Sequence, residues 1–441
     1  MRKASLLLVG VVMGAAVTMM AGAPGLLSGS LANASNRDAY EQLDLFGSVF
    51  ERIRAAYVDQ PMDEELITGA INGMLETLDP HSGYLSETEY REMLEQTSGE
   101  FGGLGIEVTM EDGYVKVIAP IDDTPASRAG IMAGDVITHL DGESVQGLSL
   151  TDAVKLMRGE IGTDILLRVQ RGNGDPLEIT VVRDTIRIRS VRSELLDDVG
   201  YIRITSFSSQ TETDLRRALD TLTTQADGNL SGFVLDLRNN PGGLLDQAVA
   251  VSDTFLDRGE IVSTRGREPE QIERRNARPG DELRGAKLII LINGGSASAS
   301  EIVAGALQDH RRATVVGTRS FGKASVQTMI PLGGSNGALK LTTARYYTPS
   351  GTSIQAQGIT PDIVIQQTVP EELQGQDVTE GEAGLPNHLS GDVEEEASGS
   401  STYVPREREE DDQLQFALSL MRGVATHDLF PPDPERAVVP N

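Results

Sequence analysis

Apolar residues recur at helical spacing over the first part of the chain. Two sets are separated by three or four positions, as on one face of a helix: Leu43, Phe46, Phe50 and Ile53, then Leu66, Ala70, Met74 and Leu78. The pattern predicts an N-terminal helical region over residues 37–97. The turn Asp79-Pro80-His81-Ser82 interrupts it, and there we expect His81 to cap the turn rather than to act as a base or a ligand.

Between Phe101 and about Asp184 the pattern changes to short strands punctuated by glycines. Residues 114–118 alternate as a strand, and a helix at 149–157 and a strand at 164–170 complete the unit. The segments Ala-Gly-Ile, Gly-Asp-Val-Ile and Asp-Gly lie in this order between positions 129 and 142. Together these features resemble a PDZ domain over residues 98–184.

The loop Gly103-Leu104-Gly105-Ile106 is the candidate ligand site of this unit. Glycines allow successive amide N–H groups to converge on an anion. The loop is therefore expected to hold the C-terminal carboxylate of a peptide, whose last residues add a strand to the sheet edge. The alternative is a glycine-rich turn that has no ligand.

Strands and helices alternate over residues 199–365. Residues 232–238 and 287–292 are nearly continuous apolar strands, as expected when both faces of a sheet are covered. Each ends in a glycine-rich turn that leads into a helix, and a hairpin follows at 326–346. The pattern predicts an α/β core over residues 185–368 with its site at the carboxyl ends of the strands.

Charge is concentrated near the end of the chain. The formal net charge is −28, and residues 371–412 hold fourteen acidic residues against Arg406 and Arg408. This balance argues against nucleic acid as a partner and against binding to anionic membrane surfaces. We expect an acidic, disordered tail over residues 369–441 with a short helix at 411–422, and we favour a solvated linker over a docking segment.

The N-terminus has the features of an export signal. Arg2 and Lys3 precede an apolar run from Leu6 to about Ala23, and small residues follow. Residues 1–32 are thus expected to be a signal peptide or an uncleaved membrane anchor, which predicts a periplasmic or envelope protein, anchored to the inner membrane if uncleaved. There is no cysteine and there are only five histidines, so no metal or other cofactor is expected.

The segment 294–301, Gly-Gly-Ser-Ala-Ser-Ala-Ser-Glu, offers the candidate chemistry. It lies where a predicted strand gives way to a helix, whose first N–H groups can stabilise an oxyanion. A serine nucleophile needs a base, and no histidine stands in a recognisable hydrolase motif. Lys323 on the next strand is the candidate, because burial can lower the pKa of a lysine, and Gln327 is expected on the same side of that strand.

Other interpretations of these residues remain. The small residues at 296–300 are also suited to close helix packing, and Lys323 also fits a surface turn. Ser320 and Lys323 match the Ser-x-x-Lys spacing of penicillin-binding enzymes, but Gly322 and the following strand argue against the helix which that motif needs.

Residues 40–365 resemble the C-terminal processing peptidases, also called tail-specific proteases. The matching motifs are Leu-Asp-Pro-His-Ser at 78–82, the PDZ unit, Asp-Leu-Arg-Asn-Asn-Pro-Gly-Gly at 236–243, the serine cluster and Phe-Gly-Lys at 321–323. The resemblance implies a crotonase-like core of ββα units. It also implies roles for six residues: Ser298 as nucleophile, Lys323 as general base, Gln327 as the residue that orients it, and Ala299 with Gly242 or Gly243 as oxyanion donors.

The sequence thus predicts an exported serine endopeptidase that recognises protein C-terminal tails and cleaves near them. Its expected partners are tailed protein substrates; an adaptor protein and a homo-oligomer are left open. The main rival is a PDZ adaptor on an inactive protease scaffold. A crotonase-like acyl-CoA enzyme is a weaker rival, because neither export nor a PDZ domain suits a CoA thioester.

Overall fold

The computed structural model describes residues 25–268, 270–392 and 396–438, and side chains from residue 38 onward. Most of the expected export segment, residues 1–32, therefore lies outside the described residues. Within them, no helix combines the length and the apolar character needed to cross a membrane. The chain divides into two units, Met1–Met74 and Leu75–Asn441.

The first unit consists of α2 (Gly25–Ala56) and most of α3 (Asp63–Glu76). Both helices lie where the apolar spacing predicts them. Arg54 near the end of α2 pairs with Asp63 at the start of α3 at 2.7 Å, across the short loop between them. In the second unit, α4 (Glu87–Ser98) begins at Ser86, which forms a capping box with Glu89.

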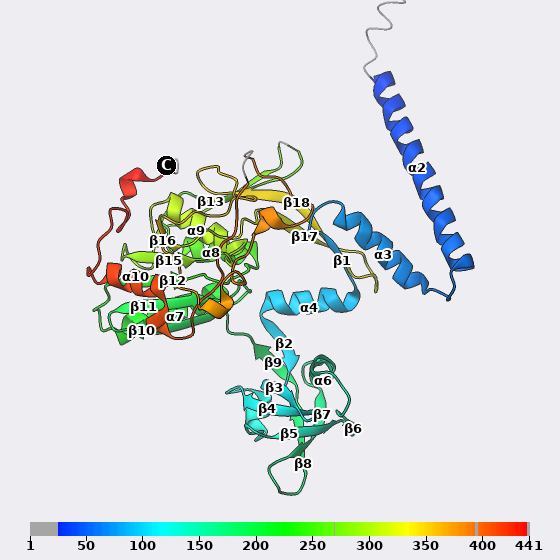
Figure 1. Cartoon of the computed structure of the whole chain (residues 1–441), viewed down its shortest axis with the longest axis horizontal. Helices are drawn as coiled ribbons and strands as arrows, with labels where there is room; N and C mark the ends of the chain where they lie inside the picture. The colour runs from blue at the N-terminus through cyan, green and yellow to red at the C-terminus, as the bar shows by residue number, and fades with distance from the viewer. Residues whose placement is uncertain (1–24, 269, 393–395, 439–441) are drawn as a thin grey trace, which may run out of the picture. The chain divides into compact units, whose positions relative to one another are not determined.

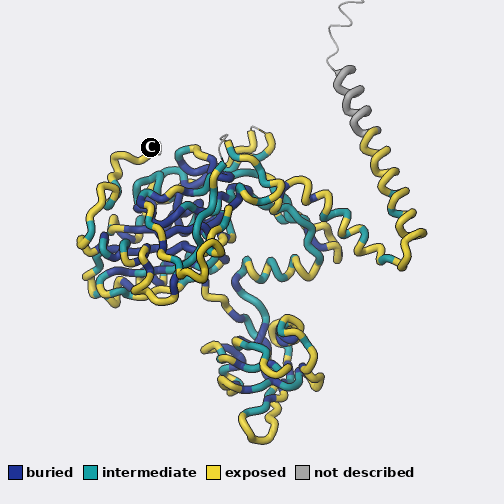
Figure 2. Tube along the Cα trace, in the orientation of Figure 1, coloured by how far each residue is buried: buried dark blue, intermediate teal, exposed yellow. Residues whose placement is uncertain are grey.

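A six-stranded sheet forms the centre of the second unit. Its strands, in spatial order, are β10 (Val191–Leu196), β11 (Val199–Ile204), β12 (Gly232–Asp236), β15 (Leu288–Ile292), β16 (Thr314–Gly317) and β19 (Ile363–Val364). All neighbours pair in parallel except β10 and β11. Every residue of β12, β15 and β16 is buried, as their apolar runs predict (Figure 2).

Helices cover both faces of this sheet (Figure 1). One core cluster packs alternate strand residues against α7 (Thr211–Gln225), α8 (Leu245–Asp253) and α9 (Ala299–Asp309). The other strand residues, among them Val234, Ile289 and Leu291, pack against α10 (Asp412–Met421). Both faces are apolar because successive strand residues point to opposite sides.

A second sheet carries the segment after Lys323. In it β18 (Ala338–Tyr347) pairs with β1 (Gly83–Leu85), β17 (Ser325–Pro331) and β13 (Glu260–Arg265), and β13 pairs with β14 (Ile272–Asn276). The antiparallel pair β17–β18 is the hairpin expected from the sequence.

The glycine-punctuated region forms a unit with its own apolar core. Its sheet contains β3 (Ile106–Glu111), β4 (Tyr114–Pro120), β5 (Val136–Leu140), β6 (Glu143–Ser144), β7 (Asp164–Gln170) and β8 (Leu177–Val182). Two helices accompany it, α5 (Pro125–Arg128) and α6 (Leu150–Met157). The chain enters and leaves through β2 (Glu100–Gly103), paired with β9 (Asp184–Arg187).

The segment after Gln366 differs from the disordered tail expected from its composition. It contains the short 3-10 turns η1 (Glu371–Leu373), η2 (Glu382–Gly384), η3 (Arg408–Glu410) and η4 (Pro434–Arg436), as well as α10. The helix α10 lies within the range expected for it. Its apolar residues Leu414, Leu418 and Met421 cover the second face of the sheet, which would otherwise be exposed. Few apolar residues suffice to hold α10 because Leu414, Leu418 and Met421 meet an apolar face of the sheet, although Leu373, Val378 and Val424 remain exposed.

Candidate active site

The three serines of the cluster differ in their hydrogen bonds. Ser296 and Ser300 are fully buried, and their hydroxyls donate to the carbonyls of Leu237 and Asn240, each at 2.9 Å. Ser298 is half-buried, and its hydroxyl donates no hydrogen bond to any described residue. The cluster therefore contains two structural serines and one that is available for chemistry.

Ser298 lies in a strained turn between β15 and α9. It is the residue before the first turn of α9 and has φ 56° and ψ −114°, a conformation that side chains other than glycine rarely adopt. Such a residue costs on the order of 1–3 kcal/mol, which the surrounding contacts must offset. The buried side chains of Ser296 and Ser300 fix the turn on either side of it.

The turn after β12 lies directly against Ser298. Gly242 has φ 100°, and a Cβ there would lie 2.8 Å from Ser298 Cβ and 2.9 Å from the amide nitrogen of Ala299. Its own N–H already donates to Asn240 Oδ1 at 2.9 Å. By contrast, the amides of Ala299 and the exposed Gly243 donate to no group in the described part of the chain. Of the two candidate glycines, only Gly243 has a free amide.

Lys323 follows Gly322 and precedes β17. Its side chain is half-buried, and its ammonium forms no hydrogen bond or ion pair with the described residues. Burial lowers the pKa of Lys323, and the like charge of Lys340 adds to this, while the carboxylates of Glu382, Glu301 and Asp79 oppose it. The net direction is the one a general base needs. No hydrogen bond joins Lys323 Nζ to Ser298 Oγ in this conformation.

Glu301, on the first turn of α9, joins the two halves of the site. Its Oε2 accepts hydrogen bonds from the amides of Ser298 at 2.8 Å and Lys323 at 2.9 Å, and its Oε1 accepts from Ser320 Oγ at 2.5 Å and the amide of Gly322 at 2.7 Å. Burial raises the pKa of this carboxyl group to about 7, although the four hydrogen bonds lower it. One carboxylate thus positions the backbone of both the serine and the lysine.

Sequence reasoning missed Glu301. A signal was present, because Ser298 and Glu301 have the Ser-x-x-Glu spacing of a capping box, in which the glutamate reaches back to the amide of the first residue. Its reach to Lys323 could not be read from that spacing. Tyr346 makes a parallel connection, since its hydroxyl donates to the carbonyls of both Ser298 and Lys323.

Gln327 forms no hydrogen bond with Lys323 among the described residues. Its Nε2 donates to Ser325 Oγ at 3.0 Å and to Thr342 Oγ1 at 3.1 Å. Strand β17 begins only at Ser325, and its pairing with β18 is irregular between Val326 and Gln327.

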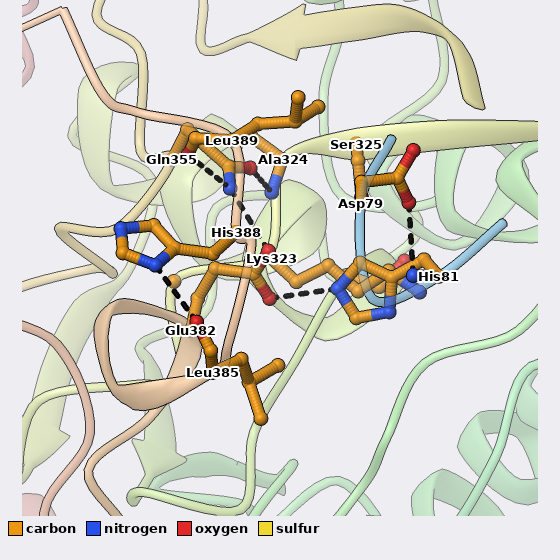
Figure 3. Close-up of polar contacts among 12 residues, drawn as sticks. Asp79, His81, Lys323, Ala324, Ser325, Gln355, Glu382, Leu385, His388 and Leu389 are labelled. Atoms are coloured by element: carbon orange, nitrogen blue, oxygen red, sulfur yellow. Dashed lines mark hydrogen bonds and ion pairs between the residues drawn. The ribbon is translucent and has the colours of Figure 1, made fainter. Parts of the chain in front are cut away.

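The turn 79–82 lies near the lysine. Asp79 accepts hydrogen bonds from the amides of His81 and Ser82, which is the turn geometry expected from the sequence. The His81 ring, however, donates from Nε2 to Glu382 Oε2 at 2.8 Å (Figure 3). The role assigned to this histidine from the sequence is therefore incomplete.

The candidate peptide-binding loop has the polarity that a carboxylate requires. The carbonyls of Leu104 and Gly105 accept from the amides of Ala126 and Ile121, at 2.8 Å and 2.9 Å. Their own amides donate to no described group. Gly105 has φ 76°, and a Cβ there would lie 2.3 Å from Thr124 Cβ, so this position requires glycine. Gly103 ends β2 and Ile106 begins β3 on either side of this turn.

The described histidine and acidic side chains do not have the arrangement that a metal site requires. Over the described ranges there is no group of three or more histidine, aspartate or glutamate residues arranged to hold a metal ion.

Three family models match the chain. Peptidase family S41 matches residues 198–365, a PDZ domain matches residues 102–182, and the N-terminal domain of the activating protease CtpB matches residues 21–89.

Two curated proteins and one solved structure illustrate the similarity. A carboxy-terminal-processing protease of Bartonella bacilliformis is 52% identical over 438 residues, which is 99% of each chain. The carboxy-terminal processing protease CtpA of Bacillus subtilis is 35% identical over 339 residues, 75% of this chain and 70% of its own. The solved photosystem II D1 C-terminal processing protease is 30% identical, with a TM-score of 0.41, and the match covers 73% of this chain and 92% of that one.

Proposed function

This chain belongs to the carboxy-terminal-processing proteases of peptidase family S41, and from that premise we propose that Ser298 is its nucleophile and Lys323 its general base. The predicted α/β protease core with an inserted PDZ domain is confirmed, as is the assignment to serine-type peptidases. The observation that carries the proposal is the Glu301 carboxylate, which binds the amides of both residues.

The reaction follows from these positions. The neutral amine of Lys323 takes the proton of the Ser298 hydroxyl as its oxygen attacks the scissile carbonyl carbon. The resulting ammonium gives that proton to the leaving amine when the C–N bond breaks. Water then attacks the acyl-enzyme, again with the amine as base, and releases the shortened protein.

The amides of Ala299 and Gly243 supply the oxyanion donors in this proposal. Both are free of other partners among the described groups, and the amide of Ala299 is at the N-terminus of α9, where the helix dipole favours negative charge. One such donor is worth about 3–4 kcal/mol in known enzymes.

The serine and lysine side chains must approach each other before reaction. Catalytic hydrogen bonds are often unformed without substrate and tighten when it binds. We propose that this closure includes Gln327, whose amide leaves Ser325 and Thr342 to orient the amine of Lys323.

We propose that the PDZ domain binds the C-terminal carboxylate of the substrate at the free amides of Leu104 and Gly105. The peptide then extends along β3 as an added strand. Arg2, Lys3 and the apolar run that follows support the further proposal that the protein is exported to the cell envelope.

The test compares the full-length wild type with Ser298→Ala and Lys323→Ala, and with Lys155→Ala as an exposed-lysine control. The substrate is an unfolded protein with a free C-terminal tail, and mass spectrometry identifies the products. Ser298→Ala and Lys323→Ala should lose at least about a thousandfold in kcat while Lys155→Ala retains it. Cleavage by Ser298→Ala would refute the proposed nucleophile, and tail binding without cleavage by the wild type would favour the adaptor.

A further inference from the structure

The loop that carries Lys323 is held by the C-terminal segment. The amides of Glu382 and Gly399 donate to the carbonyls of Phe321 and Ser320, each at 2.9 Å, and Ser400 Oγ donates to the carbonyl of Arg319 at 2.7 Å. All three donors lie beyond residues 198–365, the part that matches the peptidase family model. The loop that carries Lys323 is therefore held by residues that lie outside the matched peptidase core.

Among the described acidic residues of this segment, Glu382 is the one that is fully buried at the site. Its Oε2 accepts from His81 Nε2 at 2.8 Å, and its Oε1 accepts from Gln355 Nε2 at 2.9 Å. A buried carboxylate is costly unless such hydrogen bonds satisfy it. Both oxygens are engaged, and the two partners come from separate parts of the chain.

Gln355 connects Glu382 to the backbone beside Lys323. Its Nε2 is directed to Glu382, which leaves its Oε1 to accept from the amide of Ala324 at 2.9 Å. Ala324 directly follows Lys323. Gln355 Nε2 also donates to the carbonyl of Leu389 at 2.9 Å, so loss of Glu382 would remove one of the two acceptors that fix this amide group and would loosen the backbone beside the lysine.

Glu382 also acts on the charge of Lys323. Figure 3 shows the lysine side chain running alongside the His81–Glu382 pair. The charged and titratable groups that face its amine from the surrounding elements are Lys340, Glu382, Glu301, Asp79 and His81. Among the carboxylates, Glu382 opposes the lowering of the Lys323 pKa most strongly.

We propose that Glu382 is a positioning residue of the active site, which holds His81 and Gln355 against the Lys323 loop and so makes the C-terminal segment part of the catalytic machinery. The inference rests on the proposed role of Lys323 as general base. It assigns to the tail a function that the expected solvated linker would not have.

Two variants separate the charge of Glu382 from its hydrogen bonds. Glu382→Gln removes the charge and keeps the shape, while Glu382→Ala also leaves His81 Nε2 without its acceptor and leaves Gln355 Nε2 with the carbonyl of Leu389 alone. Glu380→Gln is the matched control, because it makes the same charge change two residues away on an exposed side chain. Each full-length variant is assayed for cleavage of a tailed protein from pH 5 to 10, with its Tm at each pH.

Removal of the charge should lower the Lys323 pKa, because an opposite charge that favours the ammonium is lost. The acid limb of the kcat/KM profile should therefore move to lower pH in Glu382→Gln. Glu382→Ala should show the same direction and lose about ten- to a hundredfold in kcat, the effect of one or two broken buried hydrogen bonds. Glu380→Gln should follow the wild type.

A second measurement does not depend on cleavage. Acetylation of Lys323 by acetic anhydride across pH, read by mass spectrometry against the exposed Lys155, reports the fraction of neutral amine. The midpoint should move to lower pH in Glu382→Gln. Loss of activity in Ser298→Ala or Lys323→Ala tests the proposed function separately.

Two results would overturn the inference. In one, both Glu382 variants keep wild-type activity and an unshifted lysine midpoint. In the other, they lose Tm and activity together at every pH without moving the limb or the midpoint, which would assign Glu382 to folding alone.

Discussion

The two halves of the proposed catalytic centre, the turn of Ser298 and the loop of Lys323, are built in different ways. The serine half is local: β15, the turn and α9 are continuous in sequence, and Ser296 and Ser300 bind the neighbouring turn after β12. The lysine half is assembled from distant segments, since His81 and Glu382 are 301 positions apart. Glu301 is the connection between them. The strained turn of Ser298, the proposed nucleophile, is thus a product of one supersecondary unit, whereas the loop of Lys323, the proposed base, is held by segments far apart in the sequence.

The largest expected effect comes from breaking that connection. Glu301→Gln replaces one of the two acceptor oxygens by an NH2 donor, so that two of the four hydrogen bonds are lost, either those from the amides of Ser298 and Lys323 or those from Ser320 Oγ and the amide of Gly322. We expect kcat to fall about a thousandfold, comparable to the loss of a catalytic group. Steady-state kinetics of the folded variant, with Glu380→Gln as control, measures this. Activity within tenfold of the wild type would show that Glu301 is not needed to position the two halves, which Tyr346 also connects.

The tail provides the next test, through the buried Arg238. This guanidinium pairs with Asp236 and with Asp411 before α10, each at 2.8 Å. Asp411→Asn removes one of the buried charges and should lower the free energy of unfolding by about 3 kcal/mol. Denaturant unfolding compares it with Asp428→Asn, an exposed aspartate on the same segment. Equal stability of the two variants would mean that α10 does not depend on this pair.

The pH dependence of stability tests Glu301 in another way. Its pKa is raised from 4.5 to about 7 in the folded state, so the folded protein holds this proton more tightly than the unfolded chain. Its contribution to stability is present below pH 4.5 and is lost as pH rises through 7, an amount of about 3 kcal/mol. Unfolding of the wild type and Glu301→Gln between pH 4 and 8 should show this slope only in the wild type. Parallel curves would contradict the raised pKa.

A smaller effect is expected in the serine half. Gly242→Ala would place a methyl group 2.8 Å from Ser298 Cβ and from the carbonyl of Ala297, and should lower kcat about a hundredfold by moving the nucleophile. Gly228→Ala is the control, because its φ of 80° imposes similar backbone strain with no atom within 4 Å of the added methyl. If both variants lose stability equally and neither loses kcat, the turn after β12 does not shape the site.

The smallest expected effect is that of Gln327→Ala. If its amide orients Lys323 only after substrate binds, kcat should fall about tenfold, as for one hydrogen bond, while Tm is nearly unchanged. Thr328→Ala on the same strand is the control, since its hydroxyl bonds only to the exposed Thr343 hydroxyl. An unchanged kcat would leave Gln327 as a structural link between β17 and β18.

The difference between the two halves also explains which features could be predicted from the sequence. Short-range patterns predicted the strand, turn and helix around Ser298, and the family motifs singled out Lys323. Contacts between residues hundreds of positions apart leave no such local pattern. The His81–Glu382 pair could therefore not be predicted from the sequence. The orienting role of Gln327 stays a prediction, because its amide bonds to Ser325 and Thr342 here and the pairing of β17 is irregular at this position.

The tail shows a further limit of composition. Its many acidic residues and few apolar ones are typical of disorder. Part of the tail is nevertheless folded, because β12 and β15 present a second apolar face and α10 covers it. Composition describes a segment alone, whereas burial depends on the surface that the segment meets.

The position of α10 in the chain has a consequence for biosynthesis. The ribosome delivers Ser298 and Lys323 well before Asp411 and the helix that follows it. A nascent chain that has emerged only to residue 365 has a sheet with one face bare and a lysine loop without its outer support. With the proposed roles of Ser298 and Lys323, the order of synthesis is expected to delay peptidase activity until the segment that holds the lysine loop has been made.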